Sequence, residues 1–199
     1  MDHYFTNNIE KSNLQFRCVK IDDKTFSFAT DNGVFSKKGL DFGSRTLISA
    51  LLKENIEGDV LDLGCGYGPI GIILSSFFNI NVDMVDINLR AIHLAKMNVK
   101  KNNCSNVNVF SSDIYSSIDK KYNYIITNPP IRAGKEVYYK FVIEAKDYLK
   151  KDGALYFVIN KNQGAKSMMK DMGKYYKVSL ILKEKSFFVI RCNLWLTSW

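Results

Sequence analysis

The chain has 199 residues, of which 46% are hydrophobic and 13% aromatic, and its formal net charge is +8. Its length and composition suit one folded domain and argue against disorder, and no apolar run approaches the roughly 20 residues that cross a bilayer. We therefore expect a cytoplasmic protein with no membrane partner. The basic excess favours a polyanion such as nucleic acid, although a solvated lysine-rich surface explains it equally well. Four scattered cysteines and two histidines predict neither a disulfide framework nor a metal site.

The first predicted elements are two short strands and a helix. Residues 14–21 and 24–31 are predicted to pair as a hairpin around Asp22-Asp23. A helical pattern begins at Ser44, a plausible N-cap, and its apolar face consists of Leu47, Ile48, Leu51 and Leu52.

The rest of the chain alternates strand-like and helix-like segments. The strand-like runs, rich in Val, Ile, Tyr and Phe, are 59–64, 81–87, 106–113, 122–127 and 154–160. The helix-like stretches are 69–78, 88–102, 135–150 and 163–175. Such alternation predicts a doubly wound, Rossmann-like α/β fold with parallel strands and helices on both faces.

The end of the chain departs from this alternation. Residues 176–183 and 186–195 both read as strands, and only Glu184-Lys185 separates them, so they are predicted to form an antiparallel hairpin. In open α/β sheets, ligands bind at the carboxyl ends of the strands. The residues that follow each strand are therefore the candidates for a site.

A glycine-rich loop, DLGCGYGPIG at 62–71, follows the first strand of the alternation. Its alternating glycines let the backbone turn tightly and approach a ligand closely. The dinucleotide fingerprint is not met, because the sixth position counted from Gly64 is Pro69, and the Gly-Lys-Ser/Thr of a phosphate-binding P-loop is absent. The loop predicts a cofactor site that holds neither NAD nor a nucleoside triphosphate.

Two acidic residues follow the next two strands. Asp86 is expected to close the second strand, twenty residues after Gly66, where a carboxylate can accept both ribose hydroxyls of a nucleoside. Asp113 is expected to close the third strand and to receive an adenine amino group, with Ile114 packed on the ring. Each aspartate alone could simply cap a turn. Together with the glycine loop they favour a nucleoside-containing cofactor.

These motifs resemble those of the class I S-adenosylmethionine-dependent methyltransferases: DLGCGYG, Asp86, Asp113 and the segment NPPI at 128–131. The resemblance implies a seven-stranded sheet with a reversed last strand. In addition, GVFSKKGLDFGSRTLI (33–48) and NPPIRAGK (128–135) resemble the catalytic domain of the guanine N2-methyltransferases of small-subunit ribosomal RNA, from about Phe16 to Leu196. The expected organisation is one methyltransferase domain over 1–199, with a hairpin and cofactor-covering segment (1–43) ahead of the Rossmann-like core (44–199).

The Asn-Pro-Pro segment offers a mechanism for methyl transfer to an exocyclic amino group. Such a nitrogen is a poor nucleophile because its lone pair is delocalised into the ring. The Asn128 side-chain oxygen and the Pro129 carbonyl could accept its two hydrogens, aim the lone pair and stabilise the positive charge that develops. The two prolines would hold this geometry rigid. The alternative is an ordinary turn, since Asn-Pro is a common turn dipeptide.

The resemblance and the residues together predict the following site. The catalytic residues are Asn128, Pro129, Pro130 and Ile131. The cofactor, S-adenosylmethionine, is expected to contact Asp41, Ser44, Asp62, Gly64, Cys65, Gly66, Gly68, Asp86, Ile87, Asp113, Ile114 and Asn128. Arg132, Lys135 and Lys38 are expected to bind an RNA substrate, either ribosomal RNA or the small-subunit particle, although each could equally cap or solvate a helix.

Three functions remain open at this stage. The first is methylation of guanine N2 in ribosomal RNA. The second is methylation of a protein glutamine or another amino substrate, which the family resemblance disfavours, because many such enzymes have an aromatic residue where this chain has Ile131. The third is a non-catalytic RNA-binding module, which would be expected to have lost the glycines, Asp86 or Asn-Pro-Pro.

Overall fold

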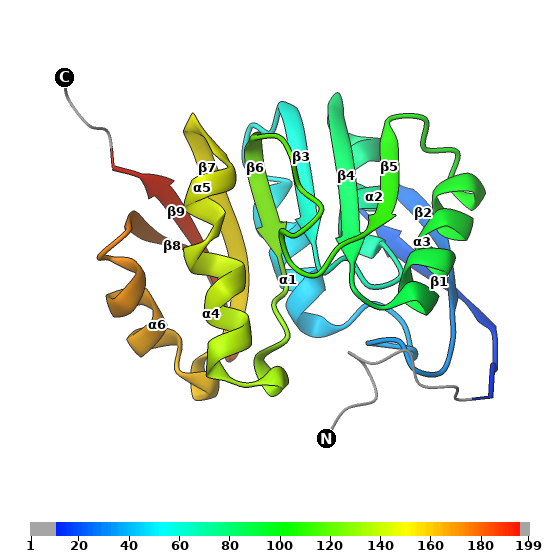
Figure 1. Cartoon of the computed structure of the whole chain (residues 1–199). Coiled ribbons are helices and arrows are strands. Elements are labelled where there is room, and N and C mark those ends of the chain that lie inside the picture. The colour runs from blue at the N-terminus through cyan, green and yellow to red at the C-terminus, as the bar shows by residue number, and fades with distance from the viewer. Residues whose placement is uncertain (1–10, 196–199) are drawn as a thin grey trace.

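The computed structural model describes residues 11–195, so His3 and the last predicted residue of the family resemblance, Leu196, lie outside the described part. A two-stranded antiparallel sheet comes first, formed by β1 (Gln15–Ile21) and β2 (Lys24–Thr30). A seven-stranded sheet follows, in the order β5-β4-β3-β6-β7-β9-β8 (Figure 1). Its strands are β3 (Gly58–Leu63), β4 (Ile80–Asp86), β5 (Val107–Ser111), β6 (Tyr122–Thr127), β7 (Leu149–Asn160), β8 (Tyr176–Glu184) and β9 (Phe187–Leu194).

The large sheet is parallel from β5 to β7 and ends in an antiparallel hairpin. β9 runs antiparallel to β7 and pairs with β8, which lies at the edge. The predicted Rossmann-like, mostly parallel sheet with its C-terminal antiparallel hairpin and small N-terminal β extension is confirmed. The central strand β3 is buried along its last four residues, as expected for a parallel strand covered on both faces.

Helices cover both faces of the sheet, as predicted. The first apolar core lies between the sheet and α1 (Phe42–Leu51), α2 (Pro69–Phe77), α3 (Leu89–Lys101) and the β1-β2 hairpin. The second core lies on the other face, beneath α4 (Lys135–Ile143), α5 (Ala145–Tyr148) and α6 (Ala165–Met172). Two short 3-10 turns, η1 (Ile131–Ala133) and η2 (Lys161–Gln163), precede α4 and α6.

Two asparagine side chains fasten the N-terminal hairpin to α3: Asn102, at the end of the helix, bonds to the Ser27 backbone, and the buried Asn98 bonds to Ala29. The Asn98 side chain accepts a hydrogen bond from the Ala29 backbone N–H at 2.7 Å and donates to the Ala29 carbonyl at 3.0 Å. It also donates to the Tyr67 carbonyl, in the glycine loop, at 2.8 Å. Because its polar atoms are satisfied by two separate segments, Asn98 ties the hairpin to the loop that forms the candidate site.

Two predicted boundaries near the site were wrong. Helix α1 begins after Asp41 rather than Ser44, because the Asp41 carboxylate accepts the Ser44 backbone N–H at 3.0 Å and so caps the helix. Strand β5 ends at Ser111, before Asp113. There, the Ser112 hydroxyl donates to the Ile114 carbonyl and accepts the Ser117 N–H, which bends the chain into a turn.

Three boundaries in the C-terminal half also differ from the prediction. The helix expected over 135–150 is divided into α4 and α5, and its last residues already belong to β7. The helix expected over 163–175 is shorter, because Gly164, with φ of 88°, separates η2 from α6. The final turn is Lys185-Ser186 rather than Glu184-Lys185, and Lys185 takes the positive φ of 52°. In residues 11–195, no helix has both the length and the apolar character to span a membrane.

Candidate functional site

The candidate site lies at the carboxyl ends of β3, β4 and β6. Strand β3 lies between the other two, and the chain continues from β4 to β5 on one side and from β6 to β7 on the other. This is the switch point at which open α/β sheets bind ligands. Helix α4 begins at this lower edge of the sheet in Figure 1.

The glycine loop forms a backbone shelf directly after β3. The N–H groups of Gly64 and Cys65 both donate to the Val85 carbonyl, each at 2.9 Å, which fixes the loop against the end of β4. Gly64, Gly66 and Gly68 have φ angles of 72°, 58° and 91°, a region that residues with a Cβ rarely occupy. A Cβ added to Gly66 would meet no atom within 4 Å, so the shelf faces open space at this residue.

Asp86 borders the shelf, as predicted. One of its carboxylate oxygens accepts the Gly66 N–H and the other accepts the Asn88 N–H, both at 2.9 Å. Removal from water raises the pKa of Asp86, and hydrogen bonds from the backbone of Asn88, Gly66 and Ile87 oppose this rise. The carboxylate has about four lone-pair sites, so it can still accept from a further donor such as a ribose hydroxyl. The neighbouring Ile87 side chain is 40% exposed and offers an apolar surface beside it.

Asp62 lies beneath the shelf and is almost completely buried. One oxygen accepts the Gly71 N–H at 2.8 Å, whereas the other has no hydrogen-bond partner among residues 11–195. Burial, and to a smaller extent the nearby Asp86 charge, raises the pKa of Asp62 to about 7. A buried acceptor without a partner is costly, so this oxygen fits a donor that the protein itself does not supply.

Two other loop residues are packed into the protein. The Cys65 side chain is buried, and burial raises the pKa of its thiol, so it is not a nucleophile of the kind that needs a thiolate. The Tyr67 ring packs edge-on against Phe28 with centroids 5.6 Å apart. Its buried hydroxyl has no hydrogen-bond partner in the described residues, and the nearby Asp41 charge adds to the effect of burial in raising its pKa.

A side-chain cluster joins the covering segment to Asn-Pro-Pro. The Asn128 side-chain nitrogen donates to the Ser44 hydroxyl at 3.0 Å and to the Asp41 carboxylate at 3.3 Å. Because this nitrogen faces α1, the Asn128 oxygen is turned away from these two acceptors. Sequence reasoning placed Asp41 and Ser44 near the cofactor, and the structure places both against Asn128.

The Asn-Pro-Pro backbone is held by a tight turn. The buried Thr127 hydroxyl donates to the Leu63 carbonyl at 2.8 Å and so joins the end of β6 to the end of β3. The Pro129 carbonyl accepts the Ile131 N–H at 2.9 Å across Pro130, whose φ and ψ of −75° and 76° are those of an inverse γ-turn. A second lone pair of the Pro129 carbonyl remains for a substrate. Ile131 itself packs against the core beneath α4.

Asp113 and Ile114 lie just beyond β5 rather than within it. The Asp113 side chain is exposed and, with Ile114, lines a hollow of about 270 Å³ whose other side is formed by Lys140, Glu144 and Tyr148. Ile114 has φ of 50°, which is unusual for a β-branched residue and is imposed by the Ser112 hydrogen bonds. Strained backbone of this kind is often found at ligand sites.

The predicted substrate-binding cations do not form one cluster. Arg132 is exposed on η1. Lys135 is directed toward α6, where its ammonium lies 4.0 Å from the Asp171 carboxylate and 4.8 Å from the centre of the Tyr139 ring. Lys38 lies on the covering segment and borders a separate hollow. Of the three cations, Arg132 is the nearest in sequence to Asn128. It forms no ion pair within residues 11–195.

Sequence reasoning missed three residues that position the site: Asn98, Ser112 and Thr127. A signal existed for Asn98, which interrupts the apolar face of a predicted helix, where a polar residue needs a partner. Ser112 and Thr127 end strand-like runs, and nothing in their local pattern distinguishes them from other strand residues. The Thr127 hydroxyl bonds to the Leu63 carbonyl, 64 residues away, which only the fold brings near, whereas the Ser112 hydroxyl bonds to backbone groups two and five residues further along the chain.

The arrangement fits S-adenosylmethionine. Gly66 opens to free space, Asp86 presents a carboxylate at the edge of the shelf, and Asp62 holds a buried acceptor with no donor to it among residues 11–195. Together with the reversed strand at the end of the sheet and Asn-Pro-Pro after β6, these features define a class I S-adenosylmethionine-dependent methyltransferase. The chain belongs to the methyltransferase small domain family, whose model matches residues 25–191.

Two relatives illustrate how far the similarity extends. The Bacillus subtilis protein YbxB, described as uncharacterized, is 40% identical over 197 residues, which cover 96% of this chain and 98% of YbxB. The ribosomal RNA small subunit methyltransferase C of Psychromonas ingrahamii is 34% identical over 165 residues, 80% of this chain and 46% of the relative. The chain therefore spans about half the length of this second relative, whereas its match to YbxB covers 98% of that protein.

Solved structures share the fold. The T. thermophilus 16S rRNA N2 methyltransferase, in complex with AdoMet and guanosine, superposes with a TM-score of 0.82 at 23% identity, over 91% of this chain and 50% of that chain. A methyltransferase from Pyrococcus furiosus gives a TM-score of 0.65 at 22% identity, over 79% of this chain and 85% of that chain. At these identities the similarity establishes the fold alone.

Proposed function

We propose that this methyltransferase transfers the methyl group of S-adenosylmethionine to the N2 amino group of guanine in ribosomal RNA. The name of the Psychromonas relative and the guanosine bound to the T. thermophilus enzyme support this substrate. The net charge of +8 supports a polyanionic partner. Ribosomal RNA of the small subunit, free or within its particle, is the substrate we expect.

The observation that carries the proposal is the orientation of Asn128. Its nitrogen is occupied by Ser44 and Asp41, so its oxygen is the end of the amide that is left for a substrate. An oxygen accepts hydrogen bonds, which is what an amino group requires. Asp41 and Ser44 are thus positioning residues, which act on the substrate through Asn128.

The chemistry follows from the two acceptors. When bound, S-adenosylmethionine supplies an electrophilic methyl group on a sulfonium, which is already a good leaving group. The Asn128 oxygen and the free lone pair of the Pro129 carbonyl accept the two amino hydrogens and favour a pyramidal nitrogen. The same oxygens stabilise the positive charge that appears on nitrogen as the N–C bond forms and the methyl–sulfur bond breaks, which leaves the cofactor as a neutral thioether. Loss of one proton from that nitrogen to water then completes the reaction.

The remaining predicted residues are proposed to hold the cofactor. Gly64, Gly66 and Gly68 provide the close backbone approach, with Cys65 filling the loop. Asp86 accepts from the ribose hydroxyls, and Ile87 and Ile114 offer apolar contact to the adenine, whose amino group Asp113 accepts. Asp62 supplies its unpartnered oxygen from below. Arg132, which is exposed on η1, is proposed to contact the RNA near the target base.

Transfer of labelled methyl groups tests the substrate. The purified protein should label undermodified small-subunit RNA or its particle, and nucleoside digestion should recover N2-methylguanine. Label found only in protein, or only in another nucleoside, contradicts the proposal. Asn128→Ala should lower kcat at least a hundredfold and leave the calorimetric affinity for S-adenosylmethionine nearly unchanged, by analogy with the loss of one preorganised oxyanion-hole donor, about 10² to 10³.

A matched control separates this role from general damage. Asn108 is an exposed asparagine on β5, and Asn108→Ala should retain full activity. If Asn128→Ala loses cofactor affinity and kcat together, then Asn128 holds the cofactor rather than the amino group.

A further inference from the structure

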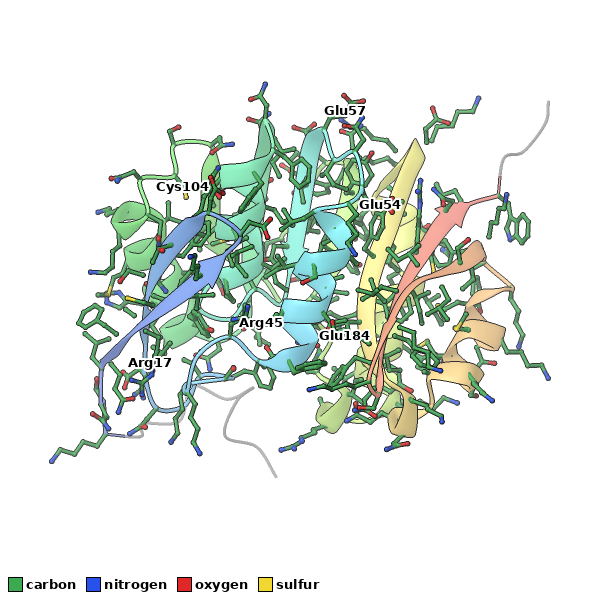
Figure 2. The ribbon with its side chains drawn as sticks, turned by 180° about the vertical axis from the view of Figure 1, so that it is seen from behind. Arg17, Arg45, Glu54, Glu57, Cys104 and Glu184 are labelled. Atoms are coloured by element: carbon green, nitrogen blue, oxygen red, sulfur yellow. The ribbon has the colours of Figure 1, made fainter. Side chains whose placement is uncertain are left out.

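A second hollow lies beside the N-terminal hairpin, outside the cofactor shelf. It has a volume of about 270 Å³ and is lined by β1, the end of β2 and the covering segment, including Gln15, Arg17, Asn32, Lys37 and Lys38. In Figure 2, Arg17 and Arg45 lie toward the lower end of the molecule, the end where α4 begins in Figure 1, whereas Glu54 and Glu57 lie at the upper end. The hollow is thus near the edge that carries the site.

The hollow is positively charged. Three cations line it, against one carboxylate, Asp31. That carboxylate is already used within the protein, since it accepts hydrogen bonds from the Ser12 hydroxyl at 2.7 Å and from the Asn32 N–H at 2.7 Å. Burial works to raise the pKa of Asp31, but these bonds prevail and lower it, so Asp31 stays ionised as part of the wall.

The cations have donors to spare. The Arg17 Nε is buried and has no hydrogen-bond partner in the described residues, while its Nη2 donates to Gln15. The Lys37 ammonium donates to the Asn32 side chain at 3.3 Å. Within residues 11–195, no carboxylate forms an ion pair with Arg17, Lys37 or Lys38. An anion with several oxygens would satisfy these donors.

The wall of the hollow is attached to the active site from two directions. The Asn32 carbonyl accepts a hydrogen bond from Arg90 at 2.8 Å, and the Gly33 carbonyl accepts one from Asn88 at 2.9 Å. Both donors lie at the start of α3, immediately after the predicted ribose acceptor Asp86. On the other side, Lys38 precedes Asp41 by three residues, so their Cα atoms are within about 11 Å of each other.

We infer that this hollow binds a backbone phosphate of the RNA strand that carries the target base, a few nucleotides away from that base. The inference rests on the proposed function. Guanidinium and ammonium donors suit phosphate oxygens, and the amide side chain of Gln15 suits a sugar or a base edge. Phosphate contacts of this kind fix the register of a strand without reading its sequence.

Binding and methylation by charge-removing variants test the hollow. In Lys38→Ala, and in Arg17→Gln combined with Lys38→Ala, the KM for RNA should rise about tenfold for each cation removed. The slope of log affinity against log salt concentration should fall by about 0.7 for each phosphate that the variant no longer neutralises. The kcat at saturating RNA and the calorimetric affinity for S-adenosylmethionine should remain unchanged. Lys38 is exposed, so its replacement does not threaten the fold.

Lys20→Ala is the matched control, because Lys20 is an exposed cation on the same strand as Arg17 but does not line the hollow. If the hollow variants match Lys20→Ala in KM and salt slope while RNA is methylated normally, the hollow is not a phosphate site and the proposed function stands. If the unaltered protein methylates no RNA, the proposed function fails instead. Competition by millimolar inorganic phosphate, with RNA affinity unaffected by the variants, would indicate a small-anion site and overturn the inference.

Discussion

Asp62→Asn is expected to change how the stability of the cofactor-free protein depends on pH. Burial raises the pKa of Asp62 from its ordinary value of 3.8 to about 7, so the fold holds this side chain more easily in its protonated form. The stability that this contributes is fully present below about pH 4 and is lost as the pH rises through 7. Asparagine has no such titration and can still accept the Gly71 N–H with its oxygen.

The size of the effect follows from the two pKa values. Moving a pKa from 3.8 to about 7 corresponds to about 4 kcal/mol between the fully protonated and the fully ionised states. Part of this change in stability occurs below pH 4.5, outside the pH range of the experiment. Between pH 4.5 and pH 8, about 3 kcal/mol should remain, which is a large share of the 5 to 15 kcal/mol that stabilises a typical domain.

Urea unfolding of both proteins without cofactor, at several pH values from 4.5 to 8, measures this difference. The unfolding free energy of Asp62→Asn relative to the unaltered protein should rise by about 3 kcal/mol over this range. Asp59→Asn is the matched control on the same strand. The hydrogen bond from Lys150 lowers the pKa of Asp59, so this carboxyl titrates below pH 4.5 and the difference for Asp59→Asn should stay nearly constant from pH 4.5 to 8. A pH-independent difference for Asp62→Asn would refute the view that Asp62 is a buried, unsatisfied carboxyl.

Three further replacements should separate catalysis from stability. Ser44→Ala removes one acceptor from the Asn128 amide, worth about 1 kcal/mol, and should lower kcat about fivefold without changing cofactor affinity in calorimetry. Gly71→Ala would place a Cβ 2.5 Å from the Met84 sulfur, so urea unfolding should show a loss of about 1 to 3 kcal/mol, and an unchanged midpoint would contradict this crowding. Thr127→Val leaves a buried carbonyl at the end of β3 without its donor and should cost about 1 to 3 kcal/mol in the same assay, with kcat falling as well; full activity would show that this bond does not hold Asn-Pro-Pro.

The sheet could be predicted because its signal is repeated along the chain. Most of the parallel strands are short apolar runs, since both faces are buried, and all of them except β5 are followed by a helix. The terminal hairpin was visible because only two residues separate two strand-like runs, too few for a crossover. Neither conclusion depends on any single contact. The same repeated strand signal placed three site features at the ends of adjacent strands: the glycine loop, Asp86 and Asn-Pro-Pro.

The errors lie where a side chain bonds to a distant segment or where capping decides an end. Ser44 and Asp41 are both good N-caps, and the choice depends on Asn128, which lies 84 residues beyond Ser44 and draws the Ser44 hydroxyl away from the helix terminus. The end of β5 depends on Ser112, whose hydroxyl favours a turn over another pair of ladder bonds. Such competition cannot be weighed from local propensity.

Residues 30–41 are the part of the covering segment that leads from the end of β2 to α1. The two ends of this stretch contact different parts of the molecule. At its first end, Thr30, Asn32 and Lys37 form the wall of the basic hollow, and the Thr30 hydroxyl donates to the Lys37 carbonyl at 3.0 Å. At its last end, Asp41 caps α1 and holds the Asn128 nitrogen. An RNA strand whose phosphate binds at the first end would therefore be positioned by the same short piece of backbone that orients the Asn128 amide at the other end. One short segment thus contributes both to the proposed phosphate site and to the orientation of the Asn128 amide.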